Sequence, residues 1–475
     1  MSHAMTPSVL QQLGACLTHP DQWLTAAEDC LAYSFDNSKR MARPQAVALC
    51  TTTAEVCALL AICHAHGVPV TARGRGTNTT GASVPMAGGL VISLERMQRI
   101  LDINTADRYA VVEPGVLNGD LQAALKPLGF FWPPDPTSAG FSSIGGNLAC
   151  NAGGPRAVKY GASRDNTLAL MAVDGRGEVF SCGSLTSKNS VGYDLTRFLV
   201  GSEGTLGIIT QATLKLVPLP VAKRALRLLY ARIEDAAAAV ARIMAQPVTP
   251  CALEFIDREA LALVRERGIE LPGGDALLLV EVDAEASALD AACKAVLAAA
   301  EGLGLVNVLV AHDTTQTETL WAARKALSPA LRRLAPKKIN EDVVVPVSRL
   351  PELIAGVDAL AREHRIRIVN FGHAGNGNIH VNLMINPDDP TQTAAAEHCL
   401  DALFTLVIGL QGTLSGEHGI GLAKRDFMPR AIDAHTLDLM RSIKAVFDPK
   451  GILNPGKLLP EPISPNDQHL RSDTQ

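Results

Sequence analysis

The stretch TARGRGTNTTGAS, residues Thr71 to Ser83, is rich in Gly and Thr and is followed by the apolar run GGLVISL, whose pattern predicts a strand. Its glycines, Gly74, Gly76 and Gly81, do not have the GxGxxG spacing of a dinucleotide-binding turn. A strand after the loop, in place of a helix, also argues against a Rossmann turn and a P-loop. The loop is therefore either an ordinary surface turn or a different pyrophosphate-binding loop, in which backbone amides and hydroxyls face the phosphates.

Two more glycine-rich stretches lie in the same half of the chain. PPDPTSAGFSSIGGNLACNAGGPRAVKYG spans Pro133 to Gly161, and GSEGTLGIIT spans Gly201 to Thr210. Small side chains let a backbone approach a ligand closely, and glycine costs conformational entropy on folding, so such clusters indicate a purpose. The three loops together predict a long, extended ligand that contains phosphate.

Composition and length limit the classes of protein that this chain can form. A chain of 475 residues with a net charge of -5 is long enough for two or three domains, and its scattered Lys and Arg argue against a nucleic-acid partner. The N-terminus has no basic segment before an apolar one, and no run reaches the roughly 20 apolar residues of a membrane helix. We therefore expect a cytoplasmic protein with no membrane span. The ten cysteines include no CxxC pair and are interpreted as reduced core thiols.

The order of the predicted elements indicates an α+β fold. Residues 1–42 are predicted as an N-terminal helical segment, and residues 43–220 as short strands separated by functional loops. Residues 221–421 contain the βαβ pattern twice, which predicts a ferredoxin-like split βαβ domain. Residues 422–460 form a C-terminal helical segment, and the polar tail over 461–475 is expected to be disordered.

Two histidines, His373 and His380, flank a tight turn in NFGHAGNGNIHVNL, residues 370–383. The central Asn-Gly pair tolerates positive φ and predicts a hairpin turn between two strands. On the second strand, alternation places the apolar residues on one face and His380 and Asn382 on the other. Both imidazoles can then point into one space beside the turn. A metal ion, a pair of catalytic bases or a hydrogen-bonded core pair would each explain them.

The order of the motifs resembles the vanillyl-alcohol oxidase family of flavoproteins, in the branch that oxidises D-2-hydroxy acids. The ordered set comprises RGRGTNTTG, PPDPTS, IGGNLACNAGG, GSEGTLGIIT, GHAGNGNIH, SGEHGIG and LNPGK, and it covers about residues 43–460. The resemblance implies a two-part FAD-binding domain of PCMH type over 43–220 and a substrate or cap domain with a metal site over 221–421. It also implies that the segment over 422–460 returns to the FAD-binding domain.

The same resemblance implies that the three glycine-rich loops and one residue of the C-terminal segment hold FAD. The first loop has no histidine between residues 73 and 83 to which a flavin could be attached, so the resemblance implies non-covalent FAD. The residues implied in cofactor binding are Arg73, Gly74, Arg75, Gly76, Thr77, Asn78, Thr79, Gly81, Ala82, Ser83, Pro134, Asp135, Ser138, Gly145, Gly146, Asn151, Gly153, Gly154, Gly161, Glu203, Gly207, Ile209 and Asn454.

The resemblance joins His373 and His380 to Glu417, in SGEHGIG, as ligands of a divalent metal. Two imidazoles and one carboxylate suit Zn²⁺, and Mn²⁺ or Fe²⁺ also fit this ligand set. The neighbouring His418 is implied as the base that takes the substrate hydroxyl proton while hydride passes from C2 to flavin N5. We interpret the glycines on either side of Glu417 and His418 as leaving room for a ligand.

Arg324 and Lys338 are candidate ligands of a substrate carboxylate, since Arg offers a planar fork and Lys a point charge, although exposed Arg and Lys are usually solvated. The D-2-hydroxyglutarate branch combines such a pair with a hydroxyl residue and an Asn, which Ser328 and Asn382 match. That branch tends to have Thr where this chain has Ser, and KINEDVVVP, residues 338–346, also resembles some bacterial D-lactate dehydrogenases. The resemblance favours D-2-hydroxyglutarate as substrate, with D-lactate as the alternative. A glycolate oxidase flavin subunit comes third, because it would need partner subunits and Asn382 does not suit that branch.

No nicotinamide fingerprint is present, so electrons are expected to pass to a quinone or an electron-transferring flavoprotein. The resemblance also makes a homodimer a reasonable expectation. Two other classes of protein stay open. One is a metal-dependent hydrolase that uses His373, His380 and Glu417 without flavin, and the other is a non-catalytic flavin-binding module.

Overall fold

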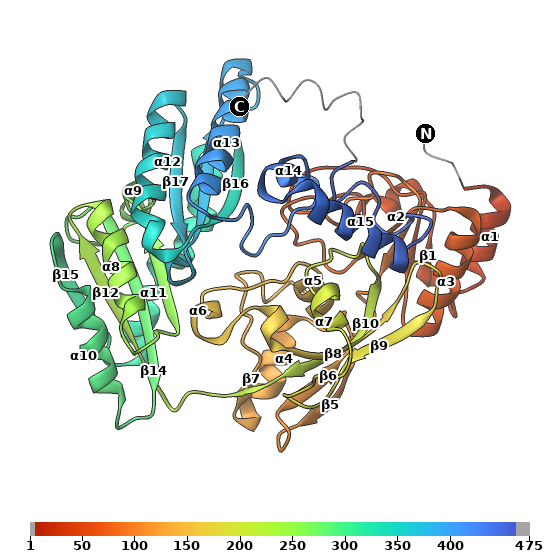
Figure 1. The fold of residues 1–475 in the computed structure, drawn as a ribbon, viewed down its shortest axis with the longest axis horizontal. Coiled ribbons are helices and arrows are strands. Elements are labelled where there is room, and N and C mark those ends of the chain that lie inside the picture. Colours follow the sequence, from red (N-terminus) through yellow and green to blue (C-terminus); the bar gives the residue numbers. More distant parts are fainter. Residues whose placement is uncertain (1–4, 462–475) are drawn as a thin grey trace.

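The structure is a computed structural model that describes residues 5–461, apart from the side chains of Ser328, Pro329 and Arg332. The predicted α+β fold is confirmed. Two smaller sheets with their helices form one lobe, and a large sheet with helices on its faces forms the other (Figure 1). Nearly all of the predicted disordered tail, residues 462–475, lies outside the described residues.

The first lobe contains a four-stranded sheet in the order β1-β2-β4-β3. β2 and β3 both run parallel to β4, and α3 connects β2 to β3. Thr52 caps α3 and forms a capping box with Glu55, which satisfies N–H groups at the start of the helix. The first glycine-rich loop follows β3 directly. The bounds are β1 Trp23–Leu24, β2 Ala46–Leu49, α3 Thr53–His66, β3 Val70–Arg73 and β4 Leu90–Ser93.

A five-stranded antiparallel sheet in the order β5-β6-β10-β8-β9 completes the first lobe. The second glycine-rich stretch contains the short helices α5 and α6, and the third leads into β10. The strands are β5 Ile100–Asn104, β6 Tyr109–Val112, β8 Thr167–Val173, β9 Val179–Gly183 and β10 Ile208–Lys215, and β7 Phe130–Phe131 pairs with β11 Val217–Pro218. The helices are α4 Asn118–Leu125, α5 Ile144–Ala149, α6 Ala157–Tyr160 and α7 Leu195–Leu199.

The N-terminal segment, with α1 Pro7–Gly14 and α2 Ala27–Leu31, packs on this lobe. The Glu55 carboxylate on α3 fixes the segment, because it accepts hydrogen bonds from the backbone and hydroxyl of Thr18 and from the amide of Gln22.

The C-terminal segment, with α14 Met428–Ala431 and α15 Ala434–Phe447, also lies against the first lobe (Figure 1). Leu453 forms an isolated parallel bridge with Val70 of β3. The Asn454 side chain donates hydrogen bonds to the carbonyls of Ala82 (2.9 Å) and Glu203 (2.7 Å). One asparagine therefore joins the end of the described chain to two of the three glycine-rich loops.

The second lobe is built on a seven-stranded antiparallel sheet in the order β15-β12-β14-β13-β17-β18-β16. Its first half has the predicted ferredoxin-like arrangement, in which β12-α8-β13 and β14-α10-β15 place β12 and β14 in the centre. These elements are β12 Ala222–Tyr230, α8 Ile233–Ala245, β13 Ala252–Ile256, α9 Arg258–Glu266, β14 Ala276–Ala284, α10 Leu289–Ala300 and β15 Leu305–Val310.

The second half of the sheet has a related order of elements. β16 is followed by α12, β17, β18 and α13, and Thr413 then forms an isolated bridge beside β16 at Val344. The two halves meet edge to edge, where β13 pairs with β17. The elements are α11 Thr314–Leu334, β16 Lys337–Val344, α12 Leu350–His364, β17 Arg367–Gly372, β18 Asn378–Ile385 and α13 Pro390–Gly409.

Helices cover the two faces of this sheet unequally. α8, α10, α12 and α13 enclose a large core on one face, which includes Ile379, Val381 and Leu383 as the alternation of β18 predicts. α9 and α11 form a smaller core on the other face, with Phe371 of β17. The part of this second face that α9 and α11 leave uncovered is available to the first lobe.

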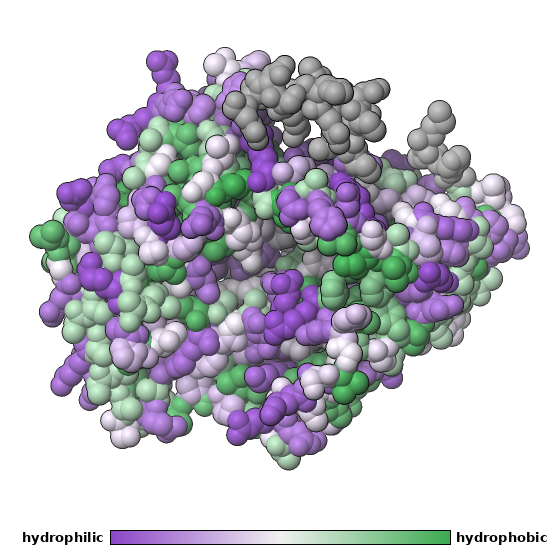
Figure 2. All heavy atoms as spheres, viewed as in Figure 1, coloured by the Kyte–Doolittle hydropathy of each residue, from purple (hydrophilic) through white to green (hydrophobic). Residues whose placement is uncertain are grey.

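Within residues 5–461, no helix combines the length and apolar character that a membrane span requires. All ten cysteines are free, and six of them are buried. On the face of the molecule that Figure 2 shows, hydrophilic and hydrophobic residues are interspersed.

Asn454 has a positive φ of 44°, which asparagine tolerates better than alanine. Asn454→Ala is expected to lower the free energy of unfolding by about 2–4 kcal/mol, because the backbone is strained and three side-chain hydrogen bonds are lost, two that Asn454 donates and one that it accepts from Lys457. Asn454→Gly loses the same hydrogen bonds without the strain and is expected to retain about 1 kcal/mol more stability than the alanine variant. Urea unfolding followed by circular dichroism measures both. Wild-type stability in Asn454→Ala would contradict this role.

Candidate active site

A cavity of about 400 Å³ lies between the two lobes. Loops of all three glycine-rich stretches line it from the first lobe, and β16, β17, β18, α11 and the loop 415–421 contribute residues from the second. The predicted cofactor residues that line it are Arg73, Gly74, Arg75, Gly76, Thr77, Asn78, Thr79, Ala82, Ser83, Ser138, Gly145, Gly146, Glu203, Gly207 and Ile209. The chain thus brings segments far apart in sequence around one space.

The remaining predicted cofactor residues do not line this cavity. These are Gly81, Pro134, Asp135, Asn151, Gly153, Gly154, Gly161 and Asn454. Several of them shape the loops instead. Gly154 has a φ of +125°, and a Cβ there would lie 2.6 Å from the carbonyl oxygen of Asp135. Asn151 has a positive φ of 52°, and its side chain accepts a hydrogen bond from the Arg164 N–H.

Close packing between loops explains glycines that the sequence suggested were there for a ligand. A Cβ on Gly145 would lie 2.6 Å from Cβ of Pro114. A Cβ on Gly416 would lie 2.6 Å from Nδ2 of the Asn378 side chain, and one on Gly419 would lie 2.6 Å from Oε1 of Glu203. Contacts within the protein therefore also favour glycine on either side of Glu417 and His418. Our interpretation that these glycines leave room for a ligand stays a prediction.

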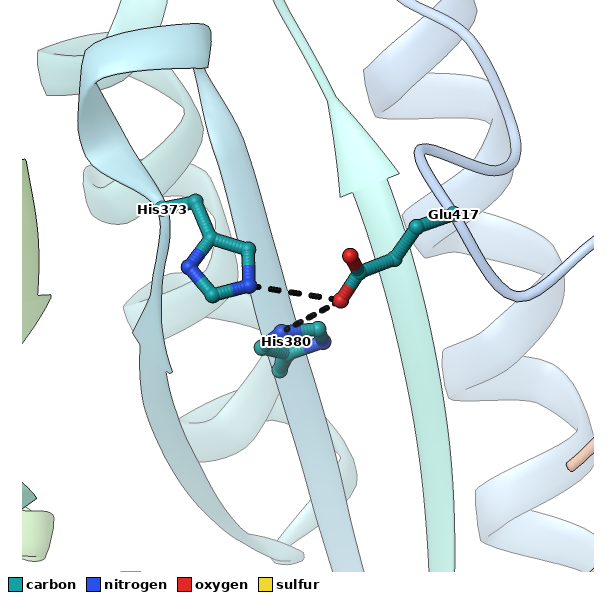
Figure 3. A group of neighbouring side chains, drawn as sticks. All are labelled: His373, His380 and Glu417. Carbon is teal, nitrogen blue, oxygen red and sulfur yellow. Dashed lines mark hydrogen bonds and ion pairs between the residues drawn. The ribbon is translucent and has the colours of Figure 1, made fainter. Parts of the chain in front are cut away.

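His373, His380 and Glu417 converge beside the hairpin turn (Figure 3). One ligand atom from each lies within 4.8 Å of the others. Oε1 of Glu417 is 3.3 Å from Nε2 of His373 and 3.6 Å from Nε2 of His380. The two imidazoles are buried and perpendicular, with ring centroids 5.3 Å apart. These three side chains could hold a metal ion.

Strand register explains why these groups meet. β17 ends at Gly372, and the hairpin returns through Gly377, whose φ of +73° permits the tight turn, so His373 and His380 lie at the same end of the β17–β18 pair. His380 lies opposite Phe371 on one side and opposite Asp342 of β16 on the other. Glu417 comes from a separate loop, after α13.

The charges around the trio shift the pKa values of its members in opposite directions. Burial lowers the pKa of His373, but the carboxylates of Glu254 and Glu417 outweigh it and raise that pKa to about 10. Burial and the neighbouring imidazoles of His418 and His373 lower the pKa of His380 to about 3. Burial opposes ionisation of Glu417, yet its histidine neighbours lower its pKa to about 2. An anionic carboxylate between imidazoles is a suitable environment for a divalent cation.

His418, the predicted base, lines the cavity and stacks on His380 with ring centroids 5.2 Å apart. Its Nδ1 is buried and lies 3.5 Å from Oδ1 of Asp342. Because Nδ1 faces a buried carboxylate, Nε2 is the ring nitrogen left to act on a substrate. Nδ1 has no hydrogen-bond partner among the described residues, and the Asp342 carboxylate lies behind the imidazole at ion-pair distance.

Asp342 holds the loop that carries Glu417 and His418. Its Oδ2 accepts hydrogen bonds from the backbone N–H groups of residues 416, 417 and 418, at 2.9, 2.7 and 2.9 Å. Lys424, itself buried, donates to Oδ1. Burial alone would raise the pKa of Asp342, but His418, Lys424 and the donated hydrogen bonds lower it far below its ordinary value. The loop is therefore fixed to β16 through one ionised side chain.

The first lobe holds the same loop from the opposite side. The Glu203 carboxylate accepts hydrogen bonds from the N–H groups of Ile420 (2.6 Å) and Gly421 (2.8 Å). The Asn78 amide donates to the carbonyl of His418 (3.1 Å), and its oxygen accepts from Thr80 and Ala82 within the glycine-rich loop. Asn78 and Glu203 thus line the cavity and also connect the two lobes through hydrogen bonds.

The predicted substrate residues have different surroundings. Arg324 is buried and lines the cavity, its Nε donates to Oε2 of Glu254 (2.6 Å), and its guanidinium lies 4.7 Å from the ring centroid of Phe371. The alternative of a solvated Arg324 is therefore wrong. Lys338 also lines the cavity. The side chain of Ser328 lies outside the described part of the chain.

Asn382 does not line the cavity. It is fully buried, and its amide donates to the carbonyls of Val369 (2.9 Å) and His380 (3.0 Å). Asn340, which lies opposite Asn382 on β16, does line the cavity, and its Oδ1 is buried without a hydrogen-bond partner within the described chain.

Sequence reasoning missed three charged residues of this site: Glu254, Asp342 and Lys424. Each is buried, and Glu254 lies in the apolar strand CALEFI, whereas Asp342 follows Glu341 in KKINEDVVVPV, of which only the second half is apolar. A charge inside a strand that is otherwise apolar costs free energy unless it is paired, so the lone carboxylate of Glu254 in CALEFI signals a partner elsewhere in the fold. That signal was present in the sequence, but it does not identify the partner.

Both halves of the chain match known protein families. Residues 44–183 match the FAD binding domain family, and residues 219–458 match the family described as FAD linked oxidases, C-terminal domain. Three relatives are similar over almost the whole chain. They are the glycolate oxidase subunit GlcD of Bacillus subtilis (37% identical over 96% of this chain and 97% of the relative), a D-lactate dehydrogenase of Anaerostipes hadrus (36%, 88% and 90%) and a D-2-hydroxyglutarate dehydrogenase of Stutzerimonas stutzeri (33%, 95% and 99%).

A solved structure of p-cresol methylhydroxylase is similar in fold, with a TM-score of 0.79 over 95% of this chain and 96% of that one. Its sequence is 16% identical, so this likeness concerns the fold alone.

Asp342→Asn is expected to lower the free energy of unfolding by about 3–5 kcal/mol, because the buried Lys424 ammonium loses one of its two carboxylate partners. The asparagine oxygen can replace only part of the acceptor capacity that the loop uses. Urea unfolding followed by circular dichroism measures the change. Asp388→Asn, at an exposed position, is the matched control and should unfold like the wild type. Equal stability of the two variants would show that Asp342 does not hold the loop.

Proposed function

Since this chain belongs to the family of FAD-linked oxidases, we propose that it oxidises a small D-2-hydroxy acid to the corresponding 2-oxo acid. The observation that carries the proposal is that His380, Glu417 and His418 line the same cavity as the three glycine-rich loops. In this proposal, the proton acceptor His418, two of the three metal ligands and the flavin share one space. The protein is an FAD-linked oxidoreductase, so the alternative of a hydrolase without flavin is excluded.

The cavity wall suits FAD. Small residues dominate the part that the first lobe contributes, and the Thr79 hydroxyl there is buried without a hydrogen-bond partner among the described residues. A hydroxyl in that position can donate to a phosphate oxygen. The first loop has no histidine, so we propose that the FAD is bound non-covalently.

We assign His373, His380 and Glu417 as ligands of a divalent cation, with Zn²⁺ as the first choice and Mn²⁺ or Fe²⁺ as alternatives. When bound, FAD would accept hydride from C2 of the substrate, and the cation would act as a Lewis acid toward the substrate oxygens. His418 takes the hydroxyl proton through Nε2, while Asp342 orients the imidazole and stabilises the positive charge that it gains.

For the substrate, we propose D-2-hydroxyglutarate first. Arg324 and Lys338 both line the cavity, so two positively charged side chains are available there to bind substrate carboxylates. A dicarboxylate uses both. One observation favours D-lactate as the second candidate, because Glu254 already neutralises Arg324, which leaves less positive charge for a second carboxylate. The relatives named above include enzymes for both acids and a glycolate oxidase subunit, so glycolate is the third candidate.

We further propose that electrons leave through a quinone or an electron-transferring flavoprotein, and that the protein is a homodimer. The absence of a nicotinamide fingerprint from the sequence supports the first of these proposals.

Anaerobic reduction of the bound flavin tests the function directly. The purified protein is mixed with D-2-hydroxyglutarate, D-lactate, D-malate or glycolate, each with and without EDTA, and the absorbance near 450 nm is followed. Fast bleaching by the diacids that EDTA abolishes is the expected result. If D-lactate or glycolate reduces the flavin faster than the diacids, that acid is the substrate instead. If no hydroxy acid reduces the flavin, the protein is a non-catalytic flavin-binding module.

His418→Ala is expected to retain FAD and to reduce it about 10²- to 10⁴-fold more slowly, because the hydroxyl proton loses its acceptor. Stopped-flow absorbance gives the rate, and the flavin-to-protein ratio verifies that the cofactor is bound. His435→Ala, at an exposed position on α15, is the matched control and should reduce flavin at the wild-type rate. A wild-type rate in His418→Ala would exclude His418 as the base.

A further inference from the structure

A single buried carboxylate, that of Glu254, lies between two parts of the proposed site. It is on β13 and has no exposed surface. Its Oε1 lies 2.5 Å from Nδ1 of His373, and its Oε2 accepts a hydrogen bond from Nε of Arg324 at 2.6 Å. Glu254 does not line the cavity itself, so it acts on a ligand only through these two neighbours.

The position of Glu254 follows from the joint between the two halves of the large sheet. β13 pairs with β17 through Phe255 opposite Gly372 and Ile256 opposite Phe371. The next step of this antiparallel register places Glu254 opposite His373. The contact is therefore a cross-strand pair at the only place where the two halves of the sheet hydrogen-bond to each other among the described residues.

Each oxygen of Glu254 fixes the orientation of one functional group. A carboxylate accepts hydrogen bonds, so the ring nitrogen of His373 that faces Oε1, Nδ1, carries a proton, and Nε2, on the side of Glu417, is the nitrogen that would bind a cation. Figure 3 shows the other ring nitrogen of His373 pointing away from Glu417. Oε2 holds the Arg324 guanidinium over the Phe371 ring, at the wall of the cavity.

We propose that Glu254 is a positioning residue that couples the two halves of substrate recognition, the metal ligand His373 and the carboxylate-binding Arg324. This inference rests on the proposed function, which supplies the roles of those two residues. It adds that metal affinity and substrate affinity depend on the same side chain. A change at Glu254 is therefore expected to weaken both, although the residue contacts neither ligand.

Glu254→Gln tests the proposal with little change in volume. A glutamine has one acceptor oxygen and one NH₂ group, so it can satisfy only one neighbour. With its NH₂ toward His373, it favours the tautomer that is protonated on Nε2 and cannot bind metal there. If the NH₂ group points toward Arg324, two hydrogen-bond donors face each other, and Arg324 has no acceptor at this position.

The measurement is the affinity for Zn²⁺ of the metal-free holoprotein with FAD bound, determined by competition with a chromogenic chelator. Glu254→Gln is expected to bind Zn²⁺ about 10- to 100-fold more weakly than the wild type. With Zn²⁺ saturating, it is expected to have a higher KM for the hydroxy acid. Arg324 loses the ion pair that holds its guanidinium at the cavity wall, and a misplaced guanidinium binds a carboxylate less well although its charge is no longer neutralised. A purely structural defect would lower the number of Zn²⁺ sites without changing the affinity of those that remain. Wild-type affinity in Glu254→Gln would overturn the proposal.

Glu281→Gln is the matched control. Glu281 is a buried glutamate on the adjacent strand β14, and it lies opposite Ala252, two residues before Glu254, so both carboxylates are on the same face of the sheet. It accepts a hydrogen bond from Trp321 and, within the part of the chain that the structure describes, forms no hydrogen bond or ion pair with His373 or Arg324. This variant should bind Zn²⁺ like the wild type, and an equal loss in both glutamine variants would overturn the specific role of Glu254.

Two further measurements separate this inference from the proposed function and from a folding failure. His380→Ala should abolish Zn²⁺ binding, and if the wild type binds no Zn²⁺ or His380→Ala binds it normally, the proposed metal site fails and the role of Glu254 fails with it. If Glu254→Gln does not fold, the ¹⁵N spectrum of the His373 side chain in the wild type provides the test. Zn²⁺ on Nε2 with a proton on Nδ1 is expected, and Zn²⁺ on Nδ1 would overturn the proposal.

Discussion

The buried carboxylate of Asp342 is the interaction on which the rest of this site depends. It is an acceptor for three consecutive backbone N–H groups of the loop 415–421 and for the Lys424 ammonium. A carboxylate with that many donors can stay ionised without solvent, because its hydrogen bonds replace those of water. Without it, Glu417 would not be held beside His373 and His380, and His418 would lose the charge behind its imidazole.

The large sheet places these groups because two units of related topology meet edge to edge. The second half contributes Asp342, His380 and the turn with His373, and the first half contributes Glu254 from its edge strand. Each of these residues lies in or beside a strand whose other face packs in an extensive apolar core. The polar groups thus belong to well-packed strands or to turns beside them, and a preorganised site requires such rigid support.

The two lobes are joined at the same loop. Glu203 and Asn78, both from glycine-rich stretches of the first lobe, bind the backbone of residues 418–421. The cavity wall and the tie between lobes are therefore built from the same residues. The close contacts at Gly416 and Gly419 fit this picture, since a side chain at either position would separate the loop from Asn378 or Glu203.

The sequence by itself determined the local features of this protein. It excluded a Rossmann turn after β3, placed the Asn-Gly turn between His373 and His380, and indicated the ferredoxin-like order of the first half of the second lobe, because each depends on residues close together in the chain. Only the tertiary structure decided which strands are neighbours and in which register. It placed Glu254 opposite His373, set Asp342 beneath the loop 415–421, paired Arg324 with a carboxylate and directed the Asn382 amide to backbone carbonyls. The physical reason is that the period of a strand fixes which face a side chain occupies, whereas pairing between distant strands depends on the packing of the whole sheet.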